Sequence, residues 1–480
     1  MTLPDSLAET APSEIVFPDD PFDVRLALGS AGLLRTFNDA AVITAADVHV
    51  AQRLAQLGGE PDQAVQLAVA LAVRGVRSGS VCVDLEQLRN QLSLADPTLP
   101  WPDPQSWLPA VAASSLVGEG RPLRFEYGLL YLDRYRRQEE QVRQDLLIRE
   151  ALPPPVVDLP ALKAGLTRLF PGDNAERQRR AAEIAATQWT TVLGGGPGTG
   201  KTTTVARILA LLLQSEPTLR VAMAAPTGKA AARLQAAVQA EASTFAAADQ
   251  HNLLTLTAST LHRLLGWVPG GGTRFRHNRD NRLPFDVVVV DETSMVSLTM
   301  MARLLEAVRP DARLVLVGDP DQLASVEAGA VLADLVAGLT ARVASKKRSA
   351  TKVESGGVVL LRKTWRFGGA IAELAAAVRD GNADEAIDVL GRSGGAVALV
   401  DPDDPGIRRD VVDAASSVRE SARSGDGEAA LDRLEQHRFC ARTALVRVVC
   451  RTGPDASRIG WPTSTTTSAK VSGTPGGRCW

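Results

Sequence analysis

The chain has 480 residues, of which 45% are hydrophobic and 22% are charged, and its formal net charge is −2. This composition is typical of a globular protein of two or three domains, and it excludes a strongly basic field over the whole molecule, so any nucleic-acid contact must be local. The four cysteines show no Cys-x-x-Cys spacing, and neither a secretion signal nor an apolar run of about 18 residues is present. We therefore expect a protein of the reducing cytoplasm without a cysteine-based metal site.

The N-terminal part of the chain divides into three segments by composition. Residues 1–20 are rich in proline and acids, and we expect them to be loose. From 21 to 142 apolar residues recur at helical spacing, most clearly in residues 65–74, which predicts a small helical domain with enough apolar surface to dock a partner. Residues 143–160 include the run Ala151-Leu-Pro-Pro-Pro-Val-Val-Asp-Leu-Pro, which is typical of a stiff linker.

The next region, residues 161–385, is expected to form an α/β core, and it opens on a polar helical segment. Gln178 lies ten residues before the first strand-like run of this region. A carboxamide at this position can pair with both edges of an adenine. By itself, Gln178 would look like part of any polar helical face.

A glycine-rich loop follows the apolar run from Gln188 to Leu193 and precedes a helix-like run from Thr203. Its Gly-x-x-x-x-Gly-Lys-Thr pattern is typical of a cradle for a nucleoside triphosphate, because glycines let backbone N–H groups converge on phosphates. Lys201 can reach the β- and γ-phosphates, and the Thr202 hydroxyl can hold Mg²⁺. A glycine-rich loop in a fold that binds no nucleotide is the alternative, which the flanking strand and helix disfavour. The predicted ATP-binding residues of the loop are Gly195, Gly196, Pro197, Gly198, Thr199, Gly200, Lys201, Thr202 and Thr203.

Two acids follow the segment 285–290, which ends in a continuous run of β-branched valines. Such a run is typical of a central parallel strand, which would deliver both carboxylates to the carboxyl edge of a sheet. We expect Asp291 to bind Mg²⁺ and Glu292 to act as the base that orients the attacking water. Acids also end strands at ordinary turns. The pair therefore predicts a catalytic site only together with the glycine-rich loop that precedes it in the chain.

Two later segments add polar groups to the same scheme. The apolar run 312–318 breaks into a loop in which Gln322 can sense the γ-phosphate, although an ordinary type I turn at residues 319–321 is the alternative. Arg366, in the segment Leu361-Arg-Lys-Thr-Trp-Arg-Phe, offers a cation for that phosphate, although an exposed arginine beside aromatic residues is commonly just stacked on the surface. The predicted catalytic residues are Lys201, Asp291, Glu292, Gln322 and Arg366.

Six segments in chain order resemble the superfamily 1 helicases, and most closely the alpha subunits of exodeoxyribonuclease V, which are the D subunits of RecBCD helicase-nucleases. These segments span roughly residues 170–385, and weaker likeness extends over the N-terminal region. They are Gly195-Gly-Pro-Gly-Thr-Gly-Lys-Thr, Ala225-Pro-Thr-Gly-Lys-Ala-Ala-Ala-Arg-Leu, Ser259-Thr-Leu-His-Arg-Leu-Leu-Gly, Asp291-Glu-Thr-Ser-Met, Gly318-Asp-Pro-Asp-Gln-Leu-Ala-Ser-Val and Thr364-Trp-Arg-Phe.

This resemblance implies a RecA-like P-loop sheet that hydrolyses ATP with Mg²⁺ and couples hydrolysis to 5′-to-3′ movement on DNA. It also implies a complex with beta and gamma subunits in double-strand break repair and recombination, in which the beta subunit cuts DNA and the gamma subunit docks on the helical region. A stand-alone helicase of the same superfamily and an ATP-binding subunit without motor activity are the alternatives. A DNA-stimulated ATPase assay with and without the partner subunits separates all three.

The resemblance also suggests where single-stranded DNA lies. The segment 221–234 predicts a strand, a turn and a helix N-terminus, a geometry that presents backbone N–H groups to a DNA phosphate. Ser259-Thr260 predicts an N-cap ahead of a short helix. Capped helices with solvated charged side chains and a surface histidine are the structural alternative. The predicted DNA contacts are Thr227, Gly228, Lys229, His262 and Arg263.

The C-terminal region departs from the family pattern. Residues 386–440 are typical of the start of a second motor domain, but residues 441–480 contain one acid, Asp455, against six Lys or Arg. Three of the four cysteines fall from Cys440 onward, and this last segment has neither helical nor strand period. We expect an incomplete second motor domain and a disordered tail, which a shifted reading frame or a truncated gene would produce.

Overall fold

The computed structural model describes residues 23–172, 175–268, 270, 274–322, 325, 327–346, 357–362, 369–392, 397, 399–400 and 404–436. Contacts within the chain divide it into two units, one up to residue 367 and one from residue 368. The predictions for Arg366 and for the segments 1–20 and 441–480 lie outside the described residues.

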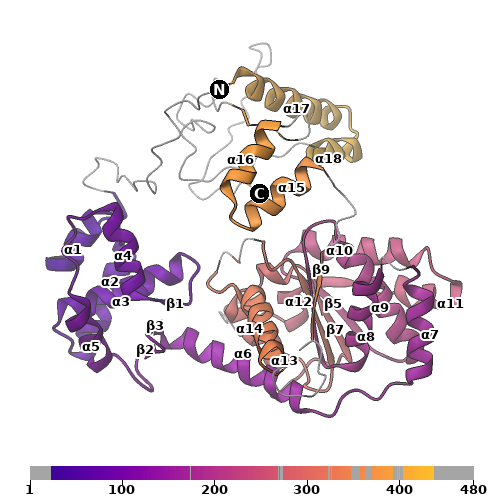
Figure 1. The fold of residues 1–480 in the computed structure, drawn as a ribbon, viewed down its shortest axis with the longest axis horizontal. Coiled ribbons are helices and arrows are strands. Elements are labelled where there is room, and N and C mark those ends of the chain that lie inside the picture. The colour runs from indigo at the N-terminus through magenta and orange to yellow at the C-terminus, as the bar shows by residue number, and fades with distance from the viewer. Residues whose placement is uncertain are drawn as a thin grey trace. The chain divides into compact units, whose positions relative to one another are not determined.

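The first part of unit 1 is a small domain of helices with a short sheet (Figure 1). Its elements are α1 (Gly32–Asp39), α2 (Ala45–Gly58), α3 (Gln63–Arg77), β1 (Cys82–Val83), α4 (Leu85–Ala95), α5 (Pro104–Ala113), β2 (Leu123–Glu126) and β3 (Leu129–Leu132). Helix α3 forms the centre, because apolar residues occupy several of its faces, and Leu71 packs in one core with Phe37 and Trp107. The Asp62 carboxylate caps α3 by accepting from the Ala64 N–H at 2.8 Å.

Strands β2 and β3 form a hairpin inside the region that the sequence predicted to be helical. They pair antiparallel, with Leu123 opposite Leu132, and β3 also pairs with β1. The two turn residues, Tyr127 and Gly128, have φ angles of +59° and +77°. Positive φ at both positions is the mark of a type I′ turn, whose twist matches that of the paired strands. The predicted small helical domain is therefore present, and it also contains a short sheet that the sequence did not indicate, because the helical spacing of the longer segments outweighed a short alternating run.

Helix α6 (Asp133–Ala151) leads from this domain to the larger part of unit 1. It packs against α13 (Leu298–Ala307), and its Asp145 forms an ion pair with Arg279 at 2.8 Å. Near the end of the helix, the Arg149 side chain is 3% exposed. Its guanidinium donates four hydrogen bonds of 2.5 to 2.8 Å, to the Thr190 hydroxyl and to the carbonyls of Trp189, Arg309 and Ala312.

The helix also changes the predicted linker. Position 142, where the sequence placed the end of the helical domain, lies inside α6, and α7 (Leu159–Leu169) begins before position 160. Of the predicted linker 143–160, only residues 152–158 are outside a helix. The prolines cluster in those residues, so the proline-rich composition marked a shorter segment than the sequence suggested.

We expect Arg149→Met to lower the free energy of unfolding by roughly 2–4 kcal/mol, because hydrogen bonds to a charged group contribute about 1.5–3 kcal/mol each and the carbonyls would lose a partner. Chemical denaturation measures this loss. Arg143→Met on the same helix is the matched control, since Arg143 is mostly exposed and pairs with its helical neighbour Glu140. The control should change stability by less than about 0.5 kcal/mol. Equal losses in the two variants would contradict the role of Arg149 as the anchor of α6.

The larger part of unit 1 is built on a six-stranded parallel sheet with the strand order β6-β5-β7-β8-β4-β9. The strands are β4 (Thr190–Gly195), β5 (Val221–Ala225), β6 (Ala258–Thr260), β7 (Val287–Val290), β8 (Arg313–Gly318) and β9 (Val358–Leu361). The connecting elements are α8 (Glu176–Thr187), α9 (Lys201–Ser215), α10 (Gly228–Ala242), α11 (Ala247–Leu254), α12 (Leu261–Leu265), the 3₁₀ turn η3 (Thr293–Met295) and α14 (Val331–Lys346). The predicted α/β fold class is thereby confirmed.

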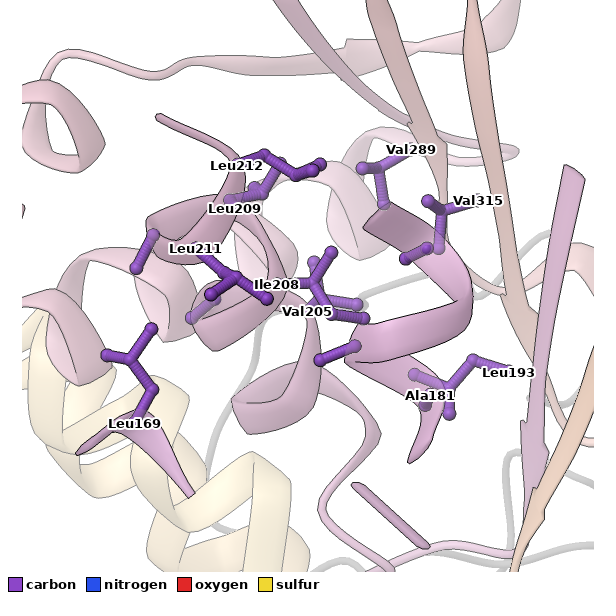
Figure 2. Packing of buried hydrophobic residues seen from close by; sticks show 14 of the residues in the cluster. Leu169, Ala181, Leu193, Val205, Ile208, Leu209, Leu211, Leu212, Val289 and Val315 are labelled. Atoms are coloured by element: carbon purple, nitrogen blue, oxygen red, sulfur yellow. The ribbon is translucent and has the colours of Figure 1, made fainter. Parts of the chain in front are cut away.

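Both faces of this sheet are buried, which explains the continuous valine run of β7. Val287 and Val289 lie in a cluster with residues of α7, α8 and α9, whereas Val288 and Val290 lie in a cluster with residues of α12, α13 and α14. Figure 2 shows the first cluster, in which Ile208 and its neighbours on α9 gather against the sheet. A parallel sheet with helices on both faces needs apolar residues at every strand position rather than at alternate ones.

The described part of unit 2 is helical. It comprises α15 (Ala370–Arg379), α16 (Ala383–Arg392), α17 (Pro405–Arg423) and α18 (Gly427–Gln436), which form two pairs of neighbouring helices. The predicted boundary between residues 385 and 386 falls inside α16, and the described residues from 386 to 436 contain no strand. A second motor domain beginning there stays a prediction. Among the described helices of the whole chain, none combines the length and the apolar character needed to cross a membrane.

Candidate active site

Loops from neighbouring strands meet at one edge of the parallel sheet. In the strand order, β8 lies between β7 and β4, and β9 pairs with the other side of β4. Because these strands are parallel, the loops after β4, β7 and β8 leave from the same edge. They lead to Lys201, Asp291 and Gln322, respectively. The sheet thus brings together predicted catalytic residues that lie far apart in the sequence.

The glycine-rich loop after β4 has a backbone that few residues other than glycine could adopt. Gly198 and Gly200 have φ angles of +74° and +85°, in the left-handed region. A Cβ on Gly195 would lie 2.7 Å from the carbonyl oxygen of Leu361, so β9 packs directly against the start of the loop. The loop ends at Lys201, the first residue of α9, where the N–H groups of the first helical turn favour an anion.

Lys201 folds back over this loop. Its Nζ donates to the carbonyls of Gly195 at 2.5 Å and Gly196 at 3.0 Å. It also lies near enough to Asp291 for its charge to lower the pKa of that carboxyl. A phosphate in the loop would replace the two carbonyls as the partner of the ammonium group. The other predicted cradle residues of this loop and of the first turn of α9 are Pro197, Thr199, Thr202 and Thr203.

Asp291 and Glu292 directly follow β7. Burial raises the pKa of Asp291 to about 6, although a hydrogen bond from the Glu292 backbone N–H at 2.9 Å and the charge of Lys201 both lower it. Glu292 has a left-handed backbone with a φ of +51°, which costs a non-glycine residue on the order of 1–3 kcal/mol. A carboxyl desolvated to this extent gains from a divalent cation, whose charge would favour the ionised form.

Gln322 lies in a turn after β8, in which its backbone N–H donates to the Asp319 carbonyl at 3.2 Å. The turn that the sequence offered as the alternative is therefore present, and it carries Gln322 to the loop after β7. There the Ser294 hydroxyl donates to Oε1 of Gln322 at 3.1 Å. The sequence did not single out Ser294, because a serine beside two acids has no pattern of its own, and its place in Asp291-Glu-Thr-Ser-Met was the one available signal.

The structure places Gln178 in the first turn of α8, and the side chain is half-buried. This helix packs against α9 and lies beside β4 and β9. The neighbouring Arg177 fixes the turn to β9 by donating to the Leu360 carbonyl at 2.8 Å. Gln178 thus lies on the helix that leads into the cradle strand, and its contact with an adenine stays a prediction.

The predicted DNA contacts follow two further strands at the same edge. Strands β5 and β6 pair in parallel with Ala225 opposite Thr260, so α10 and α12 begin side by side. Thr227 and Thr260 are the N-caps of these helices, and their hydroxyl oxygens accept from the N–H groups of Ala230 and Arg263, both at 3.2 Å. Two adjacent helix N-termini suit a phosphate backbone. Ordinary capped helices on the surface would have the same caps, so the caps do not separate the two interpretations. The exposed residues here are Gly228, Lys229, His262 and Arg263.

The residues at this edge fit a nucleoside triphosphate with a divalent cation. The first turn of α9 and Lys201 suit the phosphates, and the Thr202 hydroxyl and the Asp291 carboxylate are oxygen ligands of the kind that Mg²⁺ prefers. The start of the loop requires glycine, since a Cβ at Gly195 would clash with the Leu361 carbonyl of β9. A parallel sheet with this loop between β4 and α9 defines a P-loop nucleoside triphosphatase.

Comparison with known proteins places the chain within this class. Residues 178–328 match the model of an AAA domain, and residues 39–131 match that of the RecBCD enzyme subunit RecD, N-terminal domain. The RecBCD enzyme subunit RecD of Mycolicibacterium smegmatis is 54% identical over 417 residues, which cover 85% of this chain and 71% of that protein. That of Mycobacterium tuberculosis is 52% identical over 430 residues, which cover 87% of this chain and 71% of that protein. The chain therefore belongs to the RecD family.

A third relative is a DNA helicase by name. The ATP-dependent RecD2 DNA helicase of Deinococcus radiodurans is 38% identical over 247 residues, which cover 50% of this chain and 30% of that protein. Together with the P-loop sheet, these relatives show that the chain is an ATP-dependent helicase of the RecD type.

Nucleotide binding in the presence of Mg²⁺ should weaken as the pH falls through about 6, because the metal needs the Asp291 carboxylate and the pKa of this group is about 6 in the folded chain. Titration of a fluorescent ATP analogue between about pH 5 and pH 8 measures this, with an expected loss of roughly tenfold per pH unit below 6. Asp291→Asn should remove the pH dependence. The exposed Asp311 serves as the control, since Asp311→Asn should keep it. A flat profile for the unchanged protein would contradict this role of Asp291.

The same pKa predicts a stability change for Asp291→Asn. The pKa of this carboxyl rises on folding, here from 3.8 to about 6. Such a group does not change the free energy of unfolding at a pH below the lower value, and it lowers that free energy by its full amount at a pH above the higher value. At neutral pH the asparagine variant without nucleotide should therefore unfold at a higher temperature than the unchanged protein. Its free energy of unfolding should be higher by at most roughly 3 kcal/mol. At pH about 3.5 the difference should vanish, so a gain that persists there would have another origin.

Proposed function

We propose that this chain is the ATP-driven motor subunit of a RecBCD-type exodeoxyribonuclease V complex, moving 5′-to-3′ along a DNA strand in double-strand break repair and recombination. The observation that carries the proposal is the convergence of Lys201, Asp291 and Gln322 at one sheet edge in a chain of the RecD family. ATP is the expected nucleotide. In this proposal Gln178 faces its adenine, and Arg366 is a second cation for its γ-phosphate.

Each residue of the edge has a separate role in this proposal. Lys201 and the N-terminus of α9 neutralise the β- and γ-phosphates. Thr202 and Asp291 hold Mg²⁺, which when bound stabilises the charge on the phosphate oxygens. Glu292 orients the attacking water and accepts its proton. Gln322 donates a hydrogen bond to the γ-phosphate.

The N-termini of α10 and α12 form the proposed surface for a single DNA strand. Their start at neighbouring strands and the exposed Lys229, His262 and Arg263 support phosphates lying across both helices. The backbone N–H groups at the start of α10, from Thr227 to Gly228, add further donors. Contacts to phosphates carry no sequence information, which suits a motor that must move along any strand.

The proposed partners are the beta and gamma subunits of the complex, with the gamma subunit docked on the helical domain at residues 21–142. Large apolar side chains are exposed on this domain, which supports an interface there. The beta subunit would supply the nuclease activity, and the complex would act in the cytoplasm, where chromosomal DNA lies. The exposed apolar residues include Leu28, Leu57, Leu94 and Tyr127.

Lys201→Ala should lower ATP hydrolysis by about 100-fold or more, because the ammonium group neutralises charge as it develops on the phosphates. Glu292→Gln should also hydrolyse ATP slowly, but it should still bind ATP with Mg²⁺, since the amide keeps the shape of the side chain and cannot accept a proton. Phosphate release stimulated by single-stranded DNA, together with equilibrium ATP binding, separates the two effects.

Lys163→Ala is the matched control for this test, since Lys163 is exposed on α7. Its turnover should equal that of the unchanged protein, and circular dichroism establishes that each variant is folded. Near-normal hydrolysis by folded Lys201→Ala protein would remove the proposed function. Loss of nucleotide binding in Glu292→Gln would instead make Glu292 a structural or metal-bound residue.

The double variant Lys229→Ala/Arg263→Ala should bind single-stranded DNA more weakly, to the same degree for every sequence, and should keep its basal ATPase activity. Each lost phosphate contact should reduce the slope of log K against log salt concentration by about 0.7. Fluorescence anisotropy of labelled oligonucleotides at several salt concentrations measures both quantities. Arg53→Ala/Lys163→Ala removes the same charge from exposed positions outside this surface. An equal salt slope in both double variants would return these residues to the capped-helix interpretation.

A further inference from the structure

The loops after β7 and β8 touch each other through one buried serine. Ser294 is 6% exposed and lies on the turn η3, directly after the two acids. Its hydroxyl donates to Oε1 of Gln322 at 3.1 Å. Beside it, the Thr293 hydroxyl donates to the Val290 carbonyl at 2.9 Å, which holds the turn on the end of β7. The serine is thus fixed with respect to the sheet.

The close approach of the two loops depends on a glycine. A Cβ on Gly318, the last residue of β8, would lie 3.1 Å from the backbone nitrogen of Ser294 and 2.6 Å from a methyl group of Leu332. Gln322 is held in turn by its backbone N–H, which donates to the Asp319 carbonyl. Both partners of the hydrogen bond between Ser294 and Gln322 therefore lie on turns that other contacts define.

In the structure the Gln322 carboxamide lies with its oxygen toward the Ser294 hydroxyl, so its nitrogen is the other end of the amide. A carboxamide accepts at its oxygen and donates at its nitrogen, whereas a phosphate oxygen can only accept. Because the Ser294 hydroxyl occupies the oxygen end, the Nε2 hydrogens remain for an acceptor elsewhere. With the amide reversed, its oxygen would face the phosphate charge and repel it.

We infer that Ser294 is a positioning residue that sets the Gln322 amide with its donating end toward the γ-phosphate. The inference rests on the proposed function, in which that phosphate lies between Lys201 and Gln322. Ser294 acts through Gln322 alone. Loss of its hydroxyl should slow the hydrolytic step more than it weakens nucleotide binding, since α9 and Lys201 supply most contacts to the bound phosphates.

A double-mutant cycle on the DNA-stimulated ATPase activity of the full chain tests this inference. We expect Ser294→Ala to lower kcat about tenfold, because misplacing a group in an active site costs up to about 100-fold, and to change the KM for ATP by less than about threefold. Ser294→Ala/Gln322→Ala should be no slower than Gln322→Ala alone. Losses that multiply in the double variant would overturn the inference, because Ser294 would then act on something other than Gln322.

Ser297→Ala is the matched control. Ser297 is similarly buried, at 5% exposure, but its hydroxyl donates to Glu327 at 2.7 Å instead of to Gln322. This variant should lower stability and leave kcat unchanged. Ser294→Cys keeps the size of the side chain with a weak S–H donor, so its kcat should lie between those of Ser294→Ala and the unchanged protein. A kcat for Ser294→Ala equal to that of the unchanged protein would also overturn the inference.

The variants separate failure of this inference from failure of the proposed function. If Lys201→Ala abolishes turnover while Gln322→Ala does not, the ATPase proposal stands and the inference fails, since Gln322 then has no role for Ser294 to set. If Lys201→Ala leaves turnover intact, the proposed function itself fails. The inference then fails as well, because the site would hold no γ-phosphate for Gln322 to contact.

Discussion

Parallel pairing of β7, β8 and β4 is the constraint on which the rest of the site depends. Adjacent strands lie about 4.8 Å apart, so loops that leave the same edge of three neighbouring strands are within reach of one another's side chains. The same pairing leaves little space where the loops begin. Gly194 and Gly318 are register partners at the ends of β4 and β8, and a Cβ on either would meet a neighbouring side chain at 2.5 or 2.6 Å. The glycine at position 318 leaves space for the turn that carries Ser294, whose hydroxyl there contacts Gln322.

Two buried charges on this sheet show how hydrogen bonding decides what a charge does. Arg149 reaches a hydroxyl and three carbonyls where β4 and β8 begin, and burial lowers its pKa only to about 10, so it stays charged at neutral pH. Asp291 lies at the other ends of the strands, and its hydrogen bonds do not offset its burial, so its pKa rises to about 6. The first charge is structural because its donors are satisfied, whereas the second gains from a cation because its hydrogen bond from the Glu292 N–H and the charge of Lys201 do not offset its burial.

Helix α6 connects the N-terminal domain to this sheet by non-covalent contacts as well as by the covalent chain. It packs along α13, which begins at the Ser297 N-cap directly after η3. A second tie is a backbone hydrogen bond of 3.0 Å from the Gly329 N–H to the Gly79 carbonyl. The small helical domain and the turn beside the two acids are therefore linked through packed helices.

The sequence by itself determined the central strands, the phosphate loop and the types of residue that would do the chemistry. Continuous apolar runs predicted β4, β7 and β8, because a strand buried on both faces has no place for alternating polar residues. Only the tertiary structure decided the extent of α6, the burial of Arg149 and the contact of Ser294 with Gln322. An arginine or a serine has the same local pattern whether it is solvated or buried. Its partners and its desolvation come from segments that are distant in the chain, and no local pattern contains them.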